Sequence, residues 1–106
     1  MISGSVNIGE TTPAGVLTYV SGDVYEGEFF DGNMEGRGVF RFSNGNMYEG
    51  EWKDDKSHGI GVYRFKNGNV YEGEFRDGKR NGEGTFTYPD GENYVGDYKD
   101  GKRTGR

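Results

Sequence analysis

The sequence predicts an all-β fold: an elongated, twisted, single-layer antiparallel sheet of tandem 23-residue β-hairpins. The first observation is that all 21 glycines fall into five columns when the 106 residues are written in rows of 23. The second is that apolar and polar residues alternate with a period of two, which is typical of strands, while no segment shows helical periodicity. A fixed period of this length indicates a stack of similar small units instead of one globular core.

The period divides the chain into five parts that together form one repeat domain. In the first part, Ile2, Val6 and Pro13 stand where later units have a tyrosine, an aromatic residue and a glycine. We interpret this part as a degenerate repeat or an N-terminal cap. Three complete units follow, and the last part is a partial unit. The parts are residues 1–21, 22–44, 45–67, 68–90 and 91–106.

Each complete unit contains two strand-like runs. The first run has the pattern Tyr-x-Gly-acidic-aromatic, and the second has the pattern Gly-x-aromatic-x-aromatic. Because side chains alternate across a strand, the glycines and every aromatic residue except Phe30 share one face, and charged residues occupy the other. The first runs are residues 25–29, 48–52, 71–75 and 94–98, and the second runs are residues 38–42, 61–65 and 84–88.

The connections between units favour a three-residue loop over a two-residue hairpin turn. A two-residue turn at Asn44-Gly45 would pair Phe40 with Glu49 and split the aromatic face. A type I turn followed by a glycine in the left-handed conformation pairs Phe40 with Tyr48 instead. We therefore predict three-residue loops at residues 43–45, 66–68 and 89–91.

The same register sets large rings opposite glycines: Trp52 faces Gly36, and Phe75 faces Gly59. A ring beside a glycine can lie flat and cover the exposed backbone. Cross-strand aromatic pairs contribute on the order of 0.2–1 kcal/mol each, so many of them in a row can replace a conventional core. The chain needs such a replacement, because Leu17 is its only leucine.

The segment inside each unit, between the two runs, varies most from unit to unit. It covers residues 30–35, 53–58 and 76–81, which we predict to be loops. Asp55 stands where the other units have glycine, which predicts a strained turn or a turn of another type. Variable loops on a fixed scaffold are where partner specificity usually lies.

Composition excludes several classes of protein. A net charge of −5 argues against nucleic acid as a partner, and the absence of cysteine excludes disulfides and thiolate metal sites. No apolar run is long enough to span a bilayer, and the N-terminus lacks the features of a signal peptide. We therefore expect a cytoplasmic location.

The repeat resembles a known family. The run YEGEFRDGKRNGEG at residues 71–84 is similar to the consensus of the MORN repeat (membrane occupation and recognition nexus), and the likeness extends over residues 22–106. The resemblance implies an elongated, twisted antiparallel sheet with one hairpin per repeat. It also implies a cytoplasmic scaffold associated with cytoskeletal, ciliary or cell-division structures. Some members of the family dimerise, so a homodimer is a further expectation.

No residues suited to catalysis, metal binding or cofactor binding stand out, and we predict that the protein is not an enzyme. The recurring Gly-x-Gly pairs lack the third glycine of a dinucleotide fingerprint. His58 is the only histidine, and other units have ordinary loop residues in its place. Paired glutamates such as Glu26 and Glu28 recur in three units, which indicates a solvated structural face rather than one catalytic pair.

The aromatic face is the leading candidate for function. A one-layer sheet without helices leaves this face open unless the sheet curls over it, and large apolar patches usually meet a partner. We predict a groove that binds a helix or an extended segment of another protein, with Trp52 as the principal anchor. The predicted lining residues are Tyr25, Phe29, Tyr48, Trp52, Tyr71 and Phe75.

The alternative function is peripheral binding of acidic phospholipid headgroups at a membrane surface. Basic residues recur along one edge of the array, although acidic neighbours such as Asp54 and Asp77 weaken their field. The candidate residues are Lys53, Lys56, Arg76, Lys79, Arg80, Lys99, Lys102 and Arg103.

Overall fold

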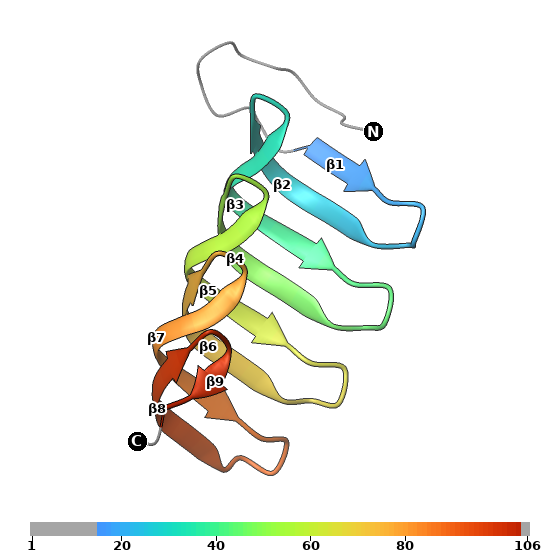
Figure 1. The fold of residues 1–106 in the computed structure, drawn as a ribbon. Coiled ribbons are helices and arrows are strands. Elements are labelled where there is room, and N and C mark those ends of the chain that lie inside the picture. The colour runs from blue at the N-terminus through green and yellow to red at the C-terminus, as the bar shows by residue number, and fades with distance from the viewer. Residues whose placement is uncertain (1–14, 105–106) are drawn as a thin grey trace.

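The structure is a computed structural model that describes residues 15–104, which form one nine-stranded antiparallel sheet (Figure 1). The strands follow one another in space in the order of the chain, and the described part contains no helix. The molecule measures 44 × 26 × 18 Å. The strands are β1 (Gly15–Thr18), β2 (Val24–Phe30), β3 (Asn33–Arg41), β4 (Met47–Lys53), β5 (Lys56–Arg64), β6 (Val70–Arg76), β7 (Lys79–Thr87), β8 (Asn93–Lys99) and β9 (Lys102–Arg103).

These strands confirm the predicted all-β sheet of tandem hairpins. One hairpin corresponds to each 23-residue unit, and successive hairpins pair through their outer strands. The degenerate repeat or cap predicted for residues 1–21 lies mostly outside the described residues. Its described part contributes β1, which pairs with β2 so that Gly15 lies opposite Gly27.

The segments inside the units are strands and not the loops that we predicted. β3 begins at Asn33, so that only Asp31 and Gly32 connect it to β2, and their φ angles are 51° and 82°. Positive φ at both central residues is the mark of a type I′ hairpin turn, whose twist matches that of the flanking strands. Asp55 adopts the same geometry with a φ of 69°, so its turn does not differ in type from the others.

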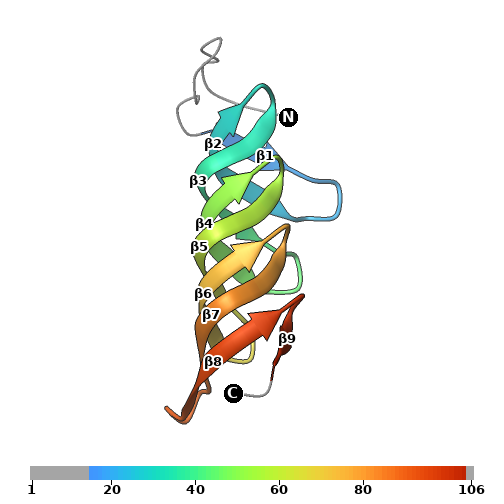
Figure 2. The same ribbon diagram turned by 60° about the vertical axis from the view of Figure 1, so that its left-hand side comes forward.

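A bulge bends each hairpin near its middle. Gly27 lies opposite Gly38, but two residues later Phe29 lies opposite Met34, so β3 has two additional residues at this point. Gly36 in the bulge has a φ of 80°, which glycine adopts without strain. The bend carries the end of each hairpin, which we call the tip, over one face of the sheet (Figure 2). The buried aromatic rings lie on this face.

Backbone hydrogen bonds join each tip to the next. The amide of Asp55 donates to the carbonyl of Met34 at 3.1 Å, and that of Gly78 donates to Ser57 at 2.9 Å. Gly101 donates to Arg80 at 2.8 Å in the same way. The curled tips therefore form a continuous wall along the array, and the single layer covers much of its own aromatic face.

The loops between units have the predicted three-residue geometry. The amide of Gly45 donates to the carbonyl of Phe42 at 3.0 Å, and Gly45 has a φ of 101°. Phe40 pairs with Tyr48, as predicted. This register also confirms that Trp52 lies opposite Gly36 and that Phe75 lies opposite Gly59.

The core consists of rings stacked on glycine pairs, but the rings that cover the glycines are tyrosines. A Cβ atom at Gly38 would lie 2.5 Å from Cε1 of Tyr25, which leaves no room for any side chain there. Gly61 stands in the same relation to Tyr48. The covering role that we predicted for Trp52 and its equivalents is thus wrong, because the bulge directs Gly36 towards Glu28 on the opposite face. We call the three tyrosines with their glycine pairs the floor; they are Tyr25, Tyr48 and Tyr71 over Gly27–Gly38, Gly50–Gly61 and Gly73–Gly84.

Candidate partner-binding groove

The floor tyrosines are fixed by a hydrogen bond that recurs in three units. Each hydroxyl donates to the carbonyl of the residue three positions ahead: Tyr25 to Glu28 at 2.7 Å, Tyr48 to Glu51 at 2.8 Å, and Tyr71 to Glu74 at 3.0 Å.

Burial raises the pKa of all three floor tyrosines, and that of Tyr71 reaches about 12. These hydroxyls therefore stay neutral donors at physiological pH.

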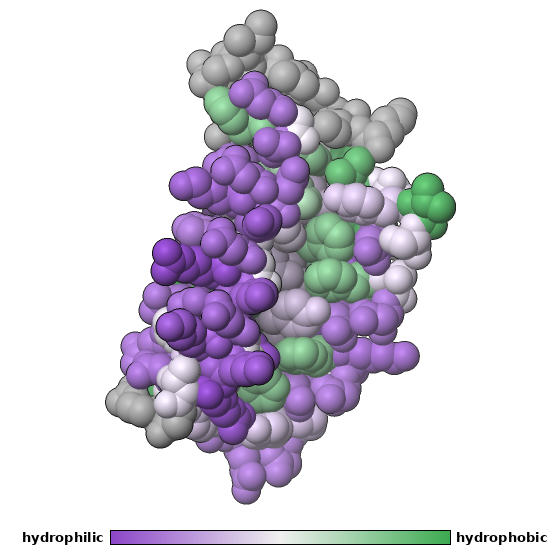
Figure 3. All heavy atoms as spheres, viewed as in Figure 1, coloured by the Kyte–Doolittle hydropathy of each residue, from purple (hydrophilic) through white to green (hydrophobic). Residues whose placement is uncertain are grey.

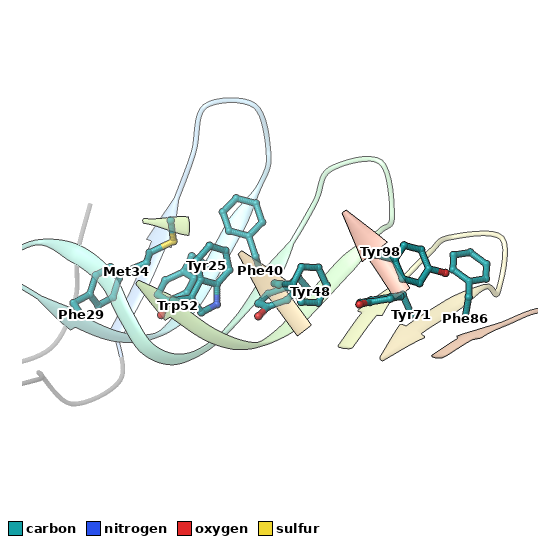
Figure 4. Close-up of a cluster of buried hydrophobic side chains, with 10 residues drawn as sticks. Tyr25, Phe29, Met34, Phe40, Tyr48, Trp52, Tyr71, Phe86 and Tyr98 are labelled. Atoms are coloured by element: carbon teal, nitrogen blue, oxygen red, sulfur yellow. The ribbon is translucent and has the colours of Figure 1, made fainter. Parts of the chain in front are cut away.

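The six aromatic residues predicted to bind a partner all belong to the cluster of buried side chains on one face. Five of them are labelled in Figure 4, and Phe75 belongs to the same cluster. Trp52 makes edge contacts with Tyr25 and Tyr48, at centroid distances of 5.3 and 5.1 Å, and its indole nitrogen donates to the Gly38 carbonyl. Trp52 is 8% exposed and Tyr71 is fully buried, so neither offers much area to another protein. The remaining four, at most 5% exposed, are Tyr25, Phe29, Tyr48 and Phe75.

Other rings on the same face are accessible, and we call them the aromatic strip. They lie towards the loops between units and are only partly buried against the core. Neighbouring rings touch: Phe42 lies 5.7 Å from Tyr63, and Tyr63 lies 4.7 Å from Phe65. Apolar residues form a line beside the polar tips in Figure 3. The aromatic strip consists of Phe42, Tyr63, Phe65, Tyr88 and Tyr94.

Between the aromatic strip and the tips lies an open groove, which contains a hollow of about 300 Å³. One wall is formed by Phe42, Tyr63 and Phe65, and the opposite wall by the tip residues Lys79 and Arg80. Tyr48 of the floor and the neighbouring rings of Trp52 and Phe75 close the bottom, and the tip residue Ser57 completes the lining.

The tips place one residue per unit against the aromatic face, and two of these residues, Ser57 and Arg80, line the groove. The sequence analysis did not predict this placement. These residues follow the two-residue turns by two positions, and we had assigned them to loops. Met34 is 5% exposed and Ser57 is 9% exposed, whereas Arg80 is half-buried. The only sequence signal was Met34, an apolar residue among the polar and glycine residues of positions 31–35. We call this set, one residue per unit, the tip column: Met34, Ser57, Arg80 and Arg103.

The eight basic residues predicted to contact lipid fall into two groups. Arg80 and Arg103 lie over aromatic rings: Arg80 is 5.2 Å from the Tyr98 ring centroid, and Arg103 is 4.0 Å from that of Tyr94. The other six are exposed on the tips and are Lys53, Lys56, Arg76, Lys79, Lys99 and Lys102. Four of these six share a hollow of about 550 Å³ with Asp77 and Asp100.

The repeated glutamates serve the bulge. The carboxylate of Glu28 accepts the amide of Arg37 at 2.7 Å, and that of Glu51 accepts the amide of Ile60 at 2.9 Å. Each bond satisfies a backbone donor in the irregular part of the ladder. Within residues 15–104, no group of three or more histidine, cysteine or acidic residues is arranged to hold a metal ion. The same residues contain no helix long and apolar enough to cross a membrane.

The hairpin period, the stacked tyrosines and the groove define a β-repeat protein of modular construction. The family model of the MORN repeat matches residues 25–47, 48–70, 71–92 and 94–106. The chain therefore belongs to the MORN-repeat family. A comparison with curated proteins gave no match. MORN repeats are generally found in binding and scaffold proteins, so the family supports a binding module in general terms.

Proposed function

We propose that the protein is a non-catalytic scaffold that binds another protein in the groove between the tips and the aromatic strip. The observation that carries the proposal is the accessible aromatic strip, which lies beside a core of buried rings on the same face. Aromatic residues in a concave site commonly supply most of the binding energy of an interface. A cytoplasmic site of action on cytoskeletal or ciliary structures is part of this proposal.

A matched pair of variants tests the groove. Phe65→Ser removes a ring of the aromatic strip, while Ile60→Ser removes an exposed apolar side chain on the opposite face. Ile60 is 55% exposed and Phe65 is only partly buried, so both variants should fold. We expect Phe65→Ser to lose most of the proteins that the unmodified chain captures from cell extract, and Ile60→Ser to retain them. Equal capture by both variants, with unchanged circular dichroism, would refute the groove.

Self-association in a homodimer is a variant of the same proposal, with a second copy as the occupant. Sedimentation of the unmodified chain and of Phe65→Ser distinguishes the two cases. A dimer that Phe65→Ser dissociates supports this variant, and a monomer at high concentration rejects it.

The second candidate is binding of acidic phospholipid headgroups at the tips. The hollow shared by Lys56, Arg76, Lys79 and Lys99 supports it, although Asp77 and Asp100 lie in the same hollow. Flotation with phosphoinositide vesicles at physiological salt tests this candidate. We expect binding that Lys56→Gln combined with Lys99→Gln abolishes; no binding by the unmodified chain would reject it.

A further inference from the structure

We propose that the groove binds an amphipathic helix with two defined contacts. A large apolar side chain of the helix enters the hollow beside Ser57, and a carboxylate one helical turn away pairs with Arg80. This inference rests on the proposed function, since it specifies the chemistry of the partner in the same groove.

The hollow exists because the tip column changes from unit to unit. In the first complete unit this position holds Met34, which is buried and packs with the core rings. In the next unit it holds Ser57, whose side chain is too short to fill the same space. The lining of the resulting hollow is mostly aromatic, and includes Trp52 and Phe75. A hollow of about 300 Å³ accommodates a large apolar side chain of a partner.

Arg80 supplies the second contact. Its guanidinium group lies over the rings of Tyr98 and Tyr71, at 5.2 and 5.7 Å from their centroids, and donates to the Gly101 carbonyl at 2.6 Å. No carboxylate within residues 15–104 forms an ion pair with it. A half-buried cation without a counter-charge favours a carboxylate that approaches from solvent, because a charge-assisted hydrogen bond then offsets its desolvation.

The remaining charges at the hollow also favour an acidic partner. Lys79 lines it together with Arg80, and no acidic residue does. Asp77 and Asp100 line a second hollow with Lys56 and Lys99, and Lys79 lines both hollows. Arg80 lines only the first, so it is the cation that we assign to the partner's carboxylate.

The backbone of the groove favours a helix over an extended strand. A strand binds by adding to a free sheet edge, where backbone donors and acceptors are unpaired. Along this groove the tip backbone is already paired with itself, through Gly78 and Ser57 and through Gly101 and Arg80. A helix satisfies its own backbone and needs only side-chain contacts.

The spacing of the two contacts follows from the repeat. Ser57 and Arg80 are one unit apart, which corresponds to about 10 Å along the array at two strand spacings. The hollow lies between them, so the carboxylate is about 5 Å from the apolar anchor, close to one helical turn. The motif expected in the partner is a large apolar residue followed or preceded by Glu or Asp at three or four positions.

The test uses the full 106-residue chain and a display library of short helical peptides with one randomised face. Peptides are selected on the unmodified chain, and the affinities of the enriched ones are then measured by fluorescence anisotropy for three proteins. Ser57→Met reproduces the side chain of the first unit and fills the hollow. Arg80→Met removes the charge and also uses a residue that this position holds elsewhere. Both variants are therefore expected to fold.

We expect the enriched peptides to carry the apolar and acidic pair at this spacing. Ser57→Met should weaken their binding by at least about tenfold, and Arg80→Met should do the same only for peptides with the acidic residue. Peptides that lack this pair, or that bind Ser57→Met as well as the unmodified chain, overturn the inference. If such peptides still lose binding to Phe65→Ser, the proposed groove is supported and only the two specific contacts are rejected.

Discussion

The floor and the tips of the hairpins are built in different ways. In the floor, Tyr25, Tyr48 and Tyr71 repeat the same contacts over the same glycines, and each unit depends on its exact residue types. At the tips, adjacent units are joined by backbone hydrogen bonds, which any sequence can form. The tip column can therefore change from Met34 to Ser57 to Arg80 without altering the fold. The comparison teaches that the invariant half of each unit supplies stability, while the variable half is free to supply binding specificity.

The largest effect on the floor should come from high pH. Burial raises the pKa of Tyr71 to about 12 in the folded chain, against about 10 in the unfolded chain. The stability contributed by its neutral hydroxyl is complete below pH 10 and is lost as pH rises from 10 to 12.

Chemical denaturation at a series of pH values checks this expectation. Above pH 10, the slope of the free energy of unfolding against pH measures the number of protons released on unfolding, and Tyr71→Phe should reduce this number by about one. Tyr25 and Tyr48 add to the slope in the same direction, because burial raises their pKa as well. A free energy of unfolding that stays constant between pH 9 and 11, in samples free of alkaline degradation, would contradict a floor of buried tyrosines.

A single methyl group in the floor should be the next most disruptive change. Gly61→Ala places a Cβ 2.6 Å from Cε1 of Tyr48, whose ring is held on both sides. We expect a loss of roughly 3 kcal/mol in the free energy of unfolding, measured by urea denaturation. The control is Gly78→Ala at a tip, where a Cβ meets nothing within 4 Å and only the positive φ of 85° is unfavourable. Equal losses for both variants would remove the distinction between floor and tips.

The tyrosine hydroxyls sharpen the comparison between units. Tyr48→Phe removes a 2.8 Å bond to the Glu51 carbonyl, and we expect a loss of about 1–2 kcal/mol because this carbonyl loses its donor. The corresponding hydroxyl of Tyr94 is buried and has no partner among residues 15–104. Tyr94→Phe should accordingly be neutral or slightly stabilising in thermal denaturation. A larger loss for Tyr94→Phe than for Tyr48→Phe would contradict this assignment.

The smallest effect is expected at the tip turn of the second complete unit. Asp55→Gly restores the residue that Gly32 and Gly78 supply in other units and relieves the positive φ of 69°. It also removes the bond from the Met34 amide to the Asp55 carboxylate at 2.7 Å. The two contributions oppose each other, so the midpoint of thermal unfolding should barely move. Asp55→Ala keeps the unfavourable φ and loses the bond, and it should be the less stable variant by about 1 kcal/mol.

The fold could be predicted from the sequence because the repeat period and the turn residues are local signals. The three-residue loops and the pairing of Phe40 with Tyr48 followed from glycine positions and alternation alone. The bulge did not follow, since two additional residues in β3 leave no mark in a polar segment. The curl that depends on it determines which rings are accessible. For this reason the sequence predicted a lining that includes Tyr25 and Trp52, which are buried, whereas the accessible rings on the same face include Phe42 and Phe65.

Joining hairpins through main-chain bonds has a consequence for protein engineering. A further copy of residues 45–67 inserted in register would extend the array by about 10 Å without a new interface having to be designed. The tip-column residue of each unit could then be chosen independently, which would give an ordered series of pockets and charges along the groove. Such a chain would select partners by the spacing of their side chains, in steps of one hairpin.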